Sequence, residues 1–257
     1  MSGMLDGMNG LSTKSALLVN GLRKLLFPPA CLFCRQPMES GDVAQGCCTG
    51  CFEHIHIWPT AVCLHCGKPM PDGMPPGPCG SCLSHPPAQS RTLNLYAYAG
   101  PVRDAVLEWK LQGREAGVRW LLSAAMPRLA HEISPDTLLL PVPMPLSRMR
   151  KSGQHHAANL CRWMADELGC AWQWQLLRRR GEQPRQSSLS GAARRKNLCN
   201  AFLLANDQGV NVEHYSSICI VDDIMTTGAT LHYAARACRK SGVPVSVLSL
   251  ARTLHRR

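Results

Sequence analysis

Two adjacent carboxylates, Asp222 and Asp223, follow an apolar run and precede a threonine-rich turn. The run 218–221 contains β-branched residues, which predicts a strand buried on both faces of a parallel sheet. Ligands of such sheets bind just beyond the carboxyl ends of the strands. The turn 226–230 opens a predicted helix over 231–241, where free N–H groups and the helix dipole attract anions. The segment therefore predicts a site for hydroxyls or a metal beside a phosphate; the alternative is a strand end with solvated acids and a threonine N-cap.

Cysteines form a second group of potential ligands, with nine of the fourteen before residue 83. Eight of them form four C-x-x-C pairs, and the pattern of two pairs recurs after 31 or 32 residues. These eight are Cys31, Cys34, Cys48, Cys51, Cys63, Cys66, Cys79 and Cys82. Each pair turns tightly enough to present two thiolates to one cation, and two pairs complete a tetrahedral Zn²⁺ site.

The cysteine pattern predicts two structural zinc sites, in preference to iron–sulfur clusters or free thiols. No coordination position is left open, and a segment so rich in Pro and Gly is expected to fold only with metal bound. Sequential pairing would give two consecutive ribbons and interleaved pairing a cross-braced unit. The sequence does not distinguish between these two arrangements.

Cationic residues accompany two further predicted turns. Lys110 and Arg114 flank Gly113 between predicted helices over 101–109 and 118–129. This turn is interpreted either as a mobile loop that covers a pyrophosphate or as a solvated helix–helix turn. Arg148 and Arg150 follow a second buried strand over 137–142 and its prolines, a position suited to binding pyrophosphate.

Composition favours an anionic ligand and a reducing compartment. The 257 residues carry a formal charge of +11, which suits phosphorylated ligands or nucleic acid, although ordinary solubility charge is an alternative. No signal peptide or membrane span of about 20 apolar residues is recognisable. The chain is therefore predicted to be cytoplasmic, where paired cysteines favour metal over disulfides.

Strands alternate with helices from about residue 93 onward, which predicts an α/β domain with a parallel sheet. Further strands are expected over 93–98, 172–177, 201–204 and 245–250, and a helix from about 155 to 168. Three parts are expected. Residues 1–28 form a tail and short helix, 29–85 a double zinc ribbon, and 93–257 the α/β domain, after a linker.

The segment 220–230 closely resembles the phosphoribosyl pyrophosphate (PRPP) loop of type I phosphoribosyltransferases, which has four hydrophobic residues, two acids and T-T-G-x-T. The resemblance implies that Asp222 and Asp223 hold the ribose hydroxyls. It implies that the 5′-phosphate is bound by Thr226, Thr227, Gly228, Ala229 and Thr230. In an active transferase, Mg²⁺ would bridge the pyrophosphate and the ribose, and Lys110 or Arg148 and Arg150 would stabilise the leaving pyrophosphate.

Ribbons followed by such a domain resemble the ComF family of competence and DNA-utilisation proteins. The likeness runs from about Cys31 to the C-terminus and includes Val142-Pro143, Gln186-x-x-Leu189 and Arg194-x-x-Asn197. Membership implies binding of PRPP or a nucleotide and a role in processing or use of imported DNA. Single-stranded DNA and DNA-uptake proteins are the partners it implies, with no membrane insertion.

The chain departs from the family on the acceptor side of the predicted site. Ser152-Gly153-Gln154-His155-His156 replaces the usual Arg-Gly-Phe-Asn-Gln. The sequence therefore supports binding of PRPP or a nucleotide better than it supports a phosphoribosyltransferase reaction in nucleoside metabolism. The alternative is an adaptor whose zinc ribbons bind single-stranded DNA while the phosphoribosyl site is catalytically silent.

Overall fold

The computed structural model describes residues 29–38, 46–145, 147, 149–150, 153–180, 201–205 and 209–254. The contacts within the chain divide it into two compact units, Met1–His54 and Ile55–Arg257. This division falls inside the span 29–85 that the sequence predicts as one ribbon module. The helix predicted within 1–28 lies outside the described residues.

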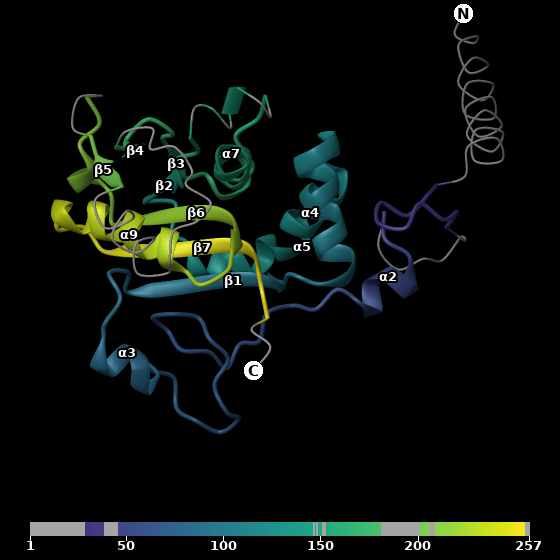
Figure 1. Cartoon of the computed structure of the whole chain (residues 1–257), viewed down its shortest axis with the longest axis horizontal. Helices are drawn as coiled ribbons and strands as arrows, with labels where there is room; N and C mark the ends of the chain where they lie inside the picture. Colours follow the sequence, from purple (N-terminus) through teal and green to yellow (C-terminus); the bar gives the residue numbers. More distant parts are fainter. Residues whose placement is uncertain are drawn as a thin grey trace, which may run out of the picture. The chain divides into compact units, whose positions relative to one another are not determined.

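The second unit is built on a five-stranded sheet whose neighbouring strands are all parallel (Figure 1). The strand order is β1-β7-β6-β2-β3. The strands are β1 Arg91–Ala97, β2 Thr137–Pro141, β3 Ala171–Trp172, β6 Ser217–Met225 and β7 Val245–Arg252. The predicted parallel α/β sheet is confirmed.

Helices connect these strands as their apolar spacing predicts. The bounds are α4 Gly100–Gln112, α5 Ala116–Glu132, α7 His156–Leu168 and α9 Ala229–Cys238, with short 3₁₀ turns η1 Val212–His214 and η2 Arg239–Ser241. Helix α4 ends because Gly113 adopts a left-handed conformation, with φ of 71°, that closes the last turn. None of the helices in the described ranges is both long and apolar enough to cross a membrane.

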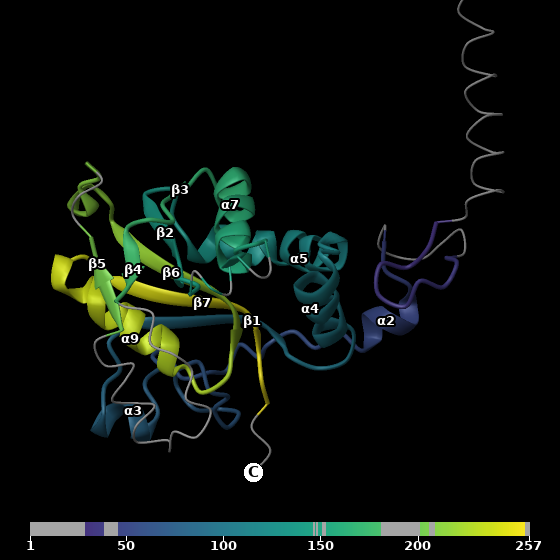
Figure 2. The same ribbon diagram turned by 45° about the horizontal axis from the view of Figure 1, so that its top comes forward.

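Helices cover both faces of the sheet (Figures 1 and 2). Because side chains alternate along a strand, Ile218 and Ile220 of β6 face one side, where they share a buried cluster with Leu231 and Ala234 of α9. Cys219 faces the other side, where α7 packs on β6 and β2. The β strands are therefore buried on both faces, which explains their nearly continuous apolar sequences.

The stretch 172–177, predicted as one strand, is divided between two sheets. Trp172 ends β3 at the edge of the parallel sheet. Leu177 begins β4, Leu177–Arg179, which pairs antiparallel with β5, Phe202–Leu204, in a separate two-stranded sheet. The residues between them include exposed Trp174, which has no strand partner and breaks the run.

The edge of β1 is covered by the segment of the second unit that contains the second cysteine set. The N–H groups of Trp58, Thr92 and Ala97 donate to the carbonyls of Leu95, Leu64 and His56, each at 2.8 Å. Six consecutive residues of β1 are consequently buried, although β1 is an edge strand. Covering an edge in this way satisfies its free hydrogen-bonding groups.

Candidate functional site

The sheet has a topological switch point between β6 and β2. From β6 the chain passes through α9 to β7 on one side, and from β2 it passes through α7 to β3 on the other side. Neighbouring strands whose connections leave in opposite directions open a crevice at their carboxyl ends. The loops after β6 and β2 therefore line the position where an α/β sheet of this kind binds its ligand.

Strand β6 runs past the end of β2 at this crevice. Its pairing with β2 stops at Val221, whereas its pairing with β7 continues through Met225. The sequence predicted that the strand ends before the acids, and this prediction was wrong by several residues. Continued pairing with β7, where Asp222 lies opposite Ser249, keeps the acids in extended backbone.

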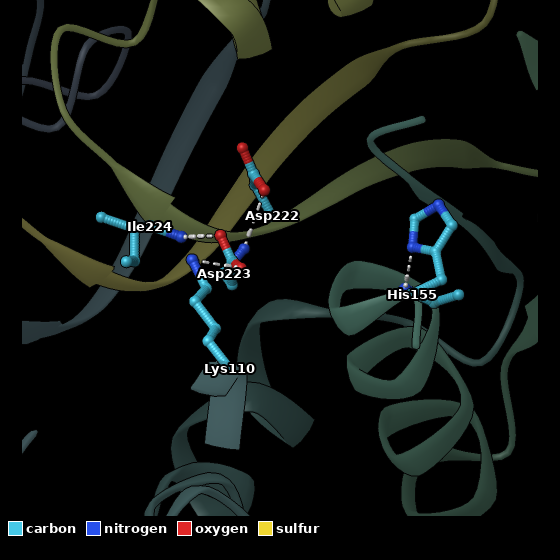
Figure 3. A network of polar contacts seen from close by, with 6 residues as sticks. Lys110, His155, Asp222, Asp223 and Ile224 are labelled. Carbon is cyan, nitrogen blue, oxygen red and sulfur yellow. Dashed lines mark hydrogen bonds and ion pairs between the residues drawn. The ribbon is translucent and has the colours of Figure 1, made fainter. Parts of the chain in front are cut away.

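The two acids project from opposite faces of β6, because successive side chains of a strand alternate (Figure 3). Asp223 faces α4, where its Oδ2 accepts from Lys110 Nζ at 2.7 Å. The Asp223 N–H donates to Asp222 Oδ1 at 2.9 Å, and the Ile224 N–H donates to Asp223 Oδ1 at 2.7 Å. Both carboxylates are thus held by the backbone of the strand that carries them.

Burial raises the pKa of Asp222 well above its usual range, and the negative charge of Asp223 raises it further. The backbone N–H of Asp223 and the cation of Lys110 act in the opposite direction but do not compensate. A carboxyl group in this state exchanges hydrogen bonds with neutral hydroxyl groups at low cost. The pair therefore combines one ion-paired acid with one acid whose protonated form is favoured.

The turn after β6 forms an anion-binding geometry. Thr226 and Thr227 are exposed, and Gly228 caps α9 with a left-handed φ of 80°. The left-handed conformation favours glycine here, whereas the Met225 methyl group, 2.4 Å from the position of a Cβ at Gly228, is the end of a flexible side chain that can shift. The Ala229 N–H donates to Thr227 Oγ1 at 3.4 Å, and the first turn of α9, which includes Thr230, begins with N–H groups that have no partner inside the helix.

The cationic residues predicted around the site occupy different positions. Lys110 belongs to the last turn of α4, not to a loop, and it is ion-paired with Asp223. Arg150 is exposed in the connection that follows β2. Arg148 lies outside the described residues.

His155 is a residue of the site that the sequence analysis did not select. It is the N-cap of α7, and its ring lies near the N–H groups of Ala158 and Met144, at 3.2 and 3.3 Å. Burial lowers the pKa of His155, and the neighbouring His156 lowers it further, while Asp223 opposes the shift. A neutral imidazole accepts at one nitrogen only, so the ring satisfies one of these two N–H groups at a time. The departure of 152–156 from the family pattern was the available signal.

The eight cysteines form two sets of four in sequential order, which decides the pairing that the sequence left open. The sets are Cys31, Cys34, Cys48 and Cys51, and Cys63, Cys66, Cys79 and Cys82, with the sulfurs of each set within 4.8 Å of one another. Sulfurs around a tetrahedral zinc ion lie about 3.8 Å apart. The distances of 3.6 Å between Cys34 and Cys48 and 3.8 Å between Cys66 and Cys79 fit this geometry.

Each set contains one thiol that favours the thiolate form. Burial alone would raise the pKa of Cys31, but N–H donors from Cys48 and neighbouring residues lower it to about 6. The pKa of Cys63 is likewise lowered to about 6 by the N–H groups of Cys66 and Cys79, against the effect of burial. Donors directed at a sulfur favour the anionic form that binds metal, so the two sets fit structural zinc.

The acids of the crevice are less suited to hold a metal by themselves. Mg²⁺ takes carboxylate oxygens, which Asp222 and Asp223 offer. However, Asp223 is already neutralised by Lys110, and the protonated form of Asp222 is favoured. The crevice alone therefore does not present a free anionic Mg²⁺ site.

Comparison with known proteins identifies the ribbons. The double zinc ribbon domain family matches residues 22–83. Yeast adenine phosphoribosyltransferase is similar with a TM-score of 0.31 and 13% identity, over 55% of this chain and 78% of that enzyme. A hypoxanthine phosphoribosyltransferase of Trypanosoma cruzi gives 0.31 and 17%, over 52% and 63%. These structural similarities are low, and the geometry of the crevice carries more weight.

Relatives in sequence extend over nearly the whole chain. The DNA utilization protein YhgH of Salmonella typhi is 32% identical over 237 residues, which cover 90% of this chain and 100% of that protein. Competence protein F of Haemophilus influenzae is 28% identical over 86% of this chain and 96% of that protein. The double zinc ribbon match includes both cysteine sets, and the chain belongs to the ComF family of competence and DNA-utilisation proteins.

Proposed function

We propose that the crevice between β6 and β2 binds a 5-phosphorylated ribose, either PRPP or a nucleotide. The observation that carries this proposal is the meeting of the acid pair and the anion-binding turn at the switch point of the sheet. Asp222 and Asp223 accept the ribose hydroxyls, and the turn 226–230 binds the 5-phosphate through N–H and hydroxyl groups. Lys110 holds Asp223 in position and contributes positive charge on the side where a pyrophosphate would lie.

Metal would enter this site together with the ligand. Mg²⁺ that arrives with a pyrophosphate ligand would neutralise part of its negative charge. The crevice residues then orient the sugar, and the cations Lys110, Arg148 and Arg150 offset the remaining negative charge. The acceptor side carries less support because Gln154 and His155 replace the usual Phe-Asn of the family there. Binding, and not a defined transferase reaction, is the activity proposed.

The relatives are named for competence and DNA utilization, and we extend that role to this chain. The protein would act in the cytoplasm on products of imported DNA, with single-stranded DNA or DNA-uptake proteins as partners. The zinc ribbons and the formal charge of +11 suit a nucleic-acid partner.

Titration of the zinc-loaded protein with PRPP and Mg²⁺ tests the proposal. Wild-type protein should show saturable heat of binding, and Asp222→Asn/Asp223→Asn should weaken it by at least about 100-fold, since two charge-assisted hydrogen-bond sets are lost. Asp104→Asn is the matched control, because Asp104 is an exposed acid on α4 that lies outside the crevice. Binding that survives the double substitution would remove the proposed site.

A further inference from the structure

A second hollow, of about 780 Å³, lies at the opposite end of the sheet from the acid pair. Its walls include residues of η1 and η2, which immediately precede β6 and β7. The hollow therefore opens near the amino ends of these strands, whereas Asp222 and Asp223 lie near the carboxyl end of β6. Five residues of extended chain separate Ser217 from Asp222, which is about 17 Å. The two sites are distinct.

One face of α9 and η2 supplies an aromatic ring and two cations to this hollow. Tyr233, Arg236, Ala237 and Lys240 line it, and their spacing of three, four and seven residues places them on one side of a helix. The distance along the helix axis from Tyr233 to Lys240 is about 10 Å. A ring at one end and positive charge at the other match the dimensions of a nucleotide.

The facing wall comes from the small antiparallel sheet. Phe202 of β5 and Arg180, which follows β4, line the hollow opposite α9. The Arg180 N–H donates to Ala201 O at 2.7 Å, which fixes the backbone that carries this third cation. Among the described residues, no carboxylate forms an ion pair with Arg180 or Lys240. Of the residues that the structure describes, three cations and one acid, Glu213 of η1, line the hollow.

Two of these cations have a partial structural explanation. Arg236 and Lys240 lie at the carboxyl end of α9, where the helix dipole stabilises positive charge. The dipole does not account for Arg180, for the adjacent aromatic side chains or for the hollow itself. The volume lies within the range of small-molecule sites, and the walls expose more polar than apolar surface, which suits a charged ligand.

We infer that this hollow binds a nucleoside phosphate. Its base would stack on the partly exposed ring of Tyr233, a contact that is favourable for any base, whereas Phe202 is buried in the core and contributes only to the wall. Its phosphate would be bound by Arg236 and Lys240, with Arg180 closing from the facing wall. A free mononucleotide and the phosphorylated end of a single strand present the same chemistry. The inference is independent of the proposed crevice site, because the two sites share no residue.

Calorimetric titration of the zinc-loaded protein distinguishes the possibilities. The probes are 5′-dAMP, deoxyadenosine, inorganic phosphate and a 5′-phosphorylated octamer of dT. Arg236→Gln/Lys240→Gln should weaken binding of dAMP or the octamer by at least about tenfold, because two charge-assisted contacts are lost. Arg239→Gln is the matched control, since Arg239 is an exposed cation of η2 that does not line the hollow. PRPP binding should be the same in all three proteins.

Each outcome is decisive for the hollow. Stronger binding of dAMP than of phosphate or deoxyadenosine supports a nucleotide site in the hollow only if it is weakened in Arg236→Gln/Lys240→Gln and not in Arg239→Gln. Tyr233→Leu should then remove the preference over phosphate. Binding of the octamer without dAMP also supports it and assigns the ligand to nucleic acid ends. No binding of either probe at millimolar concentration, or binding unchanged in Arg236→Gln/Lys240→Gln, overturns the inference without affecting the PRPP test.

Discussion

The two zinc ribbons have the same framework but different surroundings. In each ribbon, a residue with a left-handed backbone follows the first C-x-x-C pair. It is Arg35 after Cys34, with φ of 64°, and Gly67 after Cys66, with φ of 66°. Its N–H donates to the carbonyl of the first cysteine, at 2.9 Å from Arg35 to Cys31 and 2.8 Å from Gly67 to Cys63. The backbone geometry around the metal is therefore nearly identical in the two ribbons.

The second ribbon is packed into the core of the unit that contains the sheet. Arg252, the last residue of β7, is buried and donates from Nη1 to the Cys66 carbonyl at 2.5 Å. Its guanidinium also lies 5.4 Å from the ring of Trp58, whose Nε1 donates to Gly67 O at 2.9 Å. The first ribbon belongs to the other compact unit of the chain. Two sets with the same ligands can thus differ in structural role, because the second set is joined directly to β7 through Arg252 and Trp58.

The largest expected effect comes from removing one metal at a time. Cys63→Ser/Cys66→Ser should lower the unfolding midpoint of the second unit by about 10–20 °C, since structural zinc contributes several kcal/mol. Cys31→Ser/Cys34→Ser should shift it by less than about 2 °C. All six tryptophans lie in the second unit, so tryptophan fluorescence reports the unfolding of that unit alone.

Zinc content provides the control for this experiment. Each double variant should retain one zinc ion instead of two, measured by elemental analysis, so that the two proteins differ only in which ion is lost. Equal midpoints in the two variants would refute the unequal roles of the ribbons.

A smaller effect is expected from exchanging the left-handed residues. A Cβ at Gly67 would lie 2.4 Å from Asn94 Nδ2 and 2.9 Å from Thr92 Cγ2, and both side chains are buried. Gly67→Ala should therefore destabilise the second unit by about 2–4 kcal/mol, through overpacking and backbone strain. Tryptophan fluorescence during denaturant unfolding measures this change.

The matched change in the first ribbon is Arg35→Gly. Arg35 is exposed, and glycine relieves about 1 kcal/mol of left-handed strain. The tryptophan transition should stay unchanged, while the first zinc ion should become slower to leave for a chelator. Destabilisation of the second unit by Arg35→Gly, or tolerance of Gly67→Ala, would contradict the packing difference.

Local patterns made most of the fold predictable. Apolar runs fixed the central strands, and the left-handed Gly113 and the cap His155 mark helix ends near the predicted bounds. The integration of the second ribbon was not predictable, because both ribbons have the same cysteine spacing. It depends on Trp58 and Arg252, which are 194 positions apart and meet only through the sheet.

The candidate site was predictable in residue types but not in geometry. The turn with Gly228 follows from its sequence, as does the position of the acids near a strand end. That the strand continues through Asp222 and Asp223, so that they face opposite sides, depends on the pairing with β7, which local sequence does not specify. The ion pair of Lys110 with Asp223 depends on how α4 packs near β6 and is likewise a tertiary property.

The smallest expected effect is an increase in stability, on substitution of Asp222. It separates the contribution of this acid to PRPP binding from its contribution to the stability of the second unit. The pKa of Asp222 is raised by burial and by Asp223, so the folded state keeps a proton that the unfolded chain releases near pH 4. The folded state therefore binds more protons above that pH, and stability falls as pH rises toward the folded pKa.

Asp222→Asn removes this penalty, and its amide oxygen can still accept from the Asp223 N–H. At about pH 8 the substitution should stabilise the second unit by about 1 kcal/mol, or roughly 2–4 °C, and the gain should shrink as pH falls. Tryptophan-detected melting from about pH 6 to pH 8 keeps both ribbons metal-bound and measures the difference. If Asp222→Asn lowers the stability of the second unit at every pH, Asp222 stabilises the sheet. A gain in stability together with weaker PRPP binding would mean that the acid is retained for its ligand at a cost to the fold.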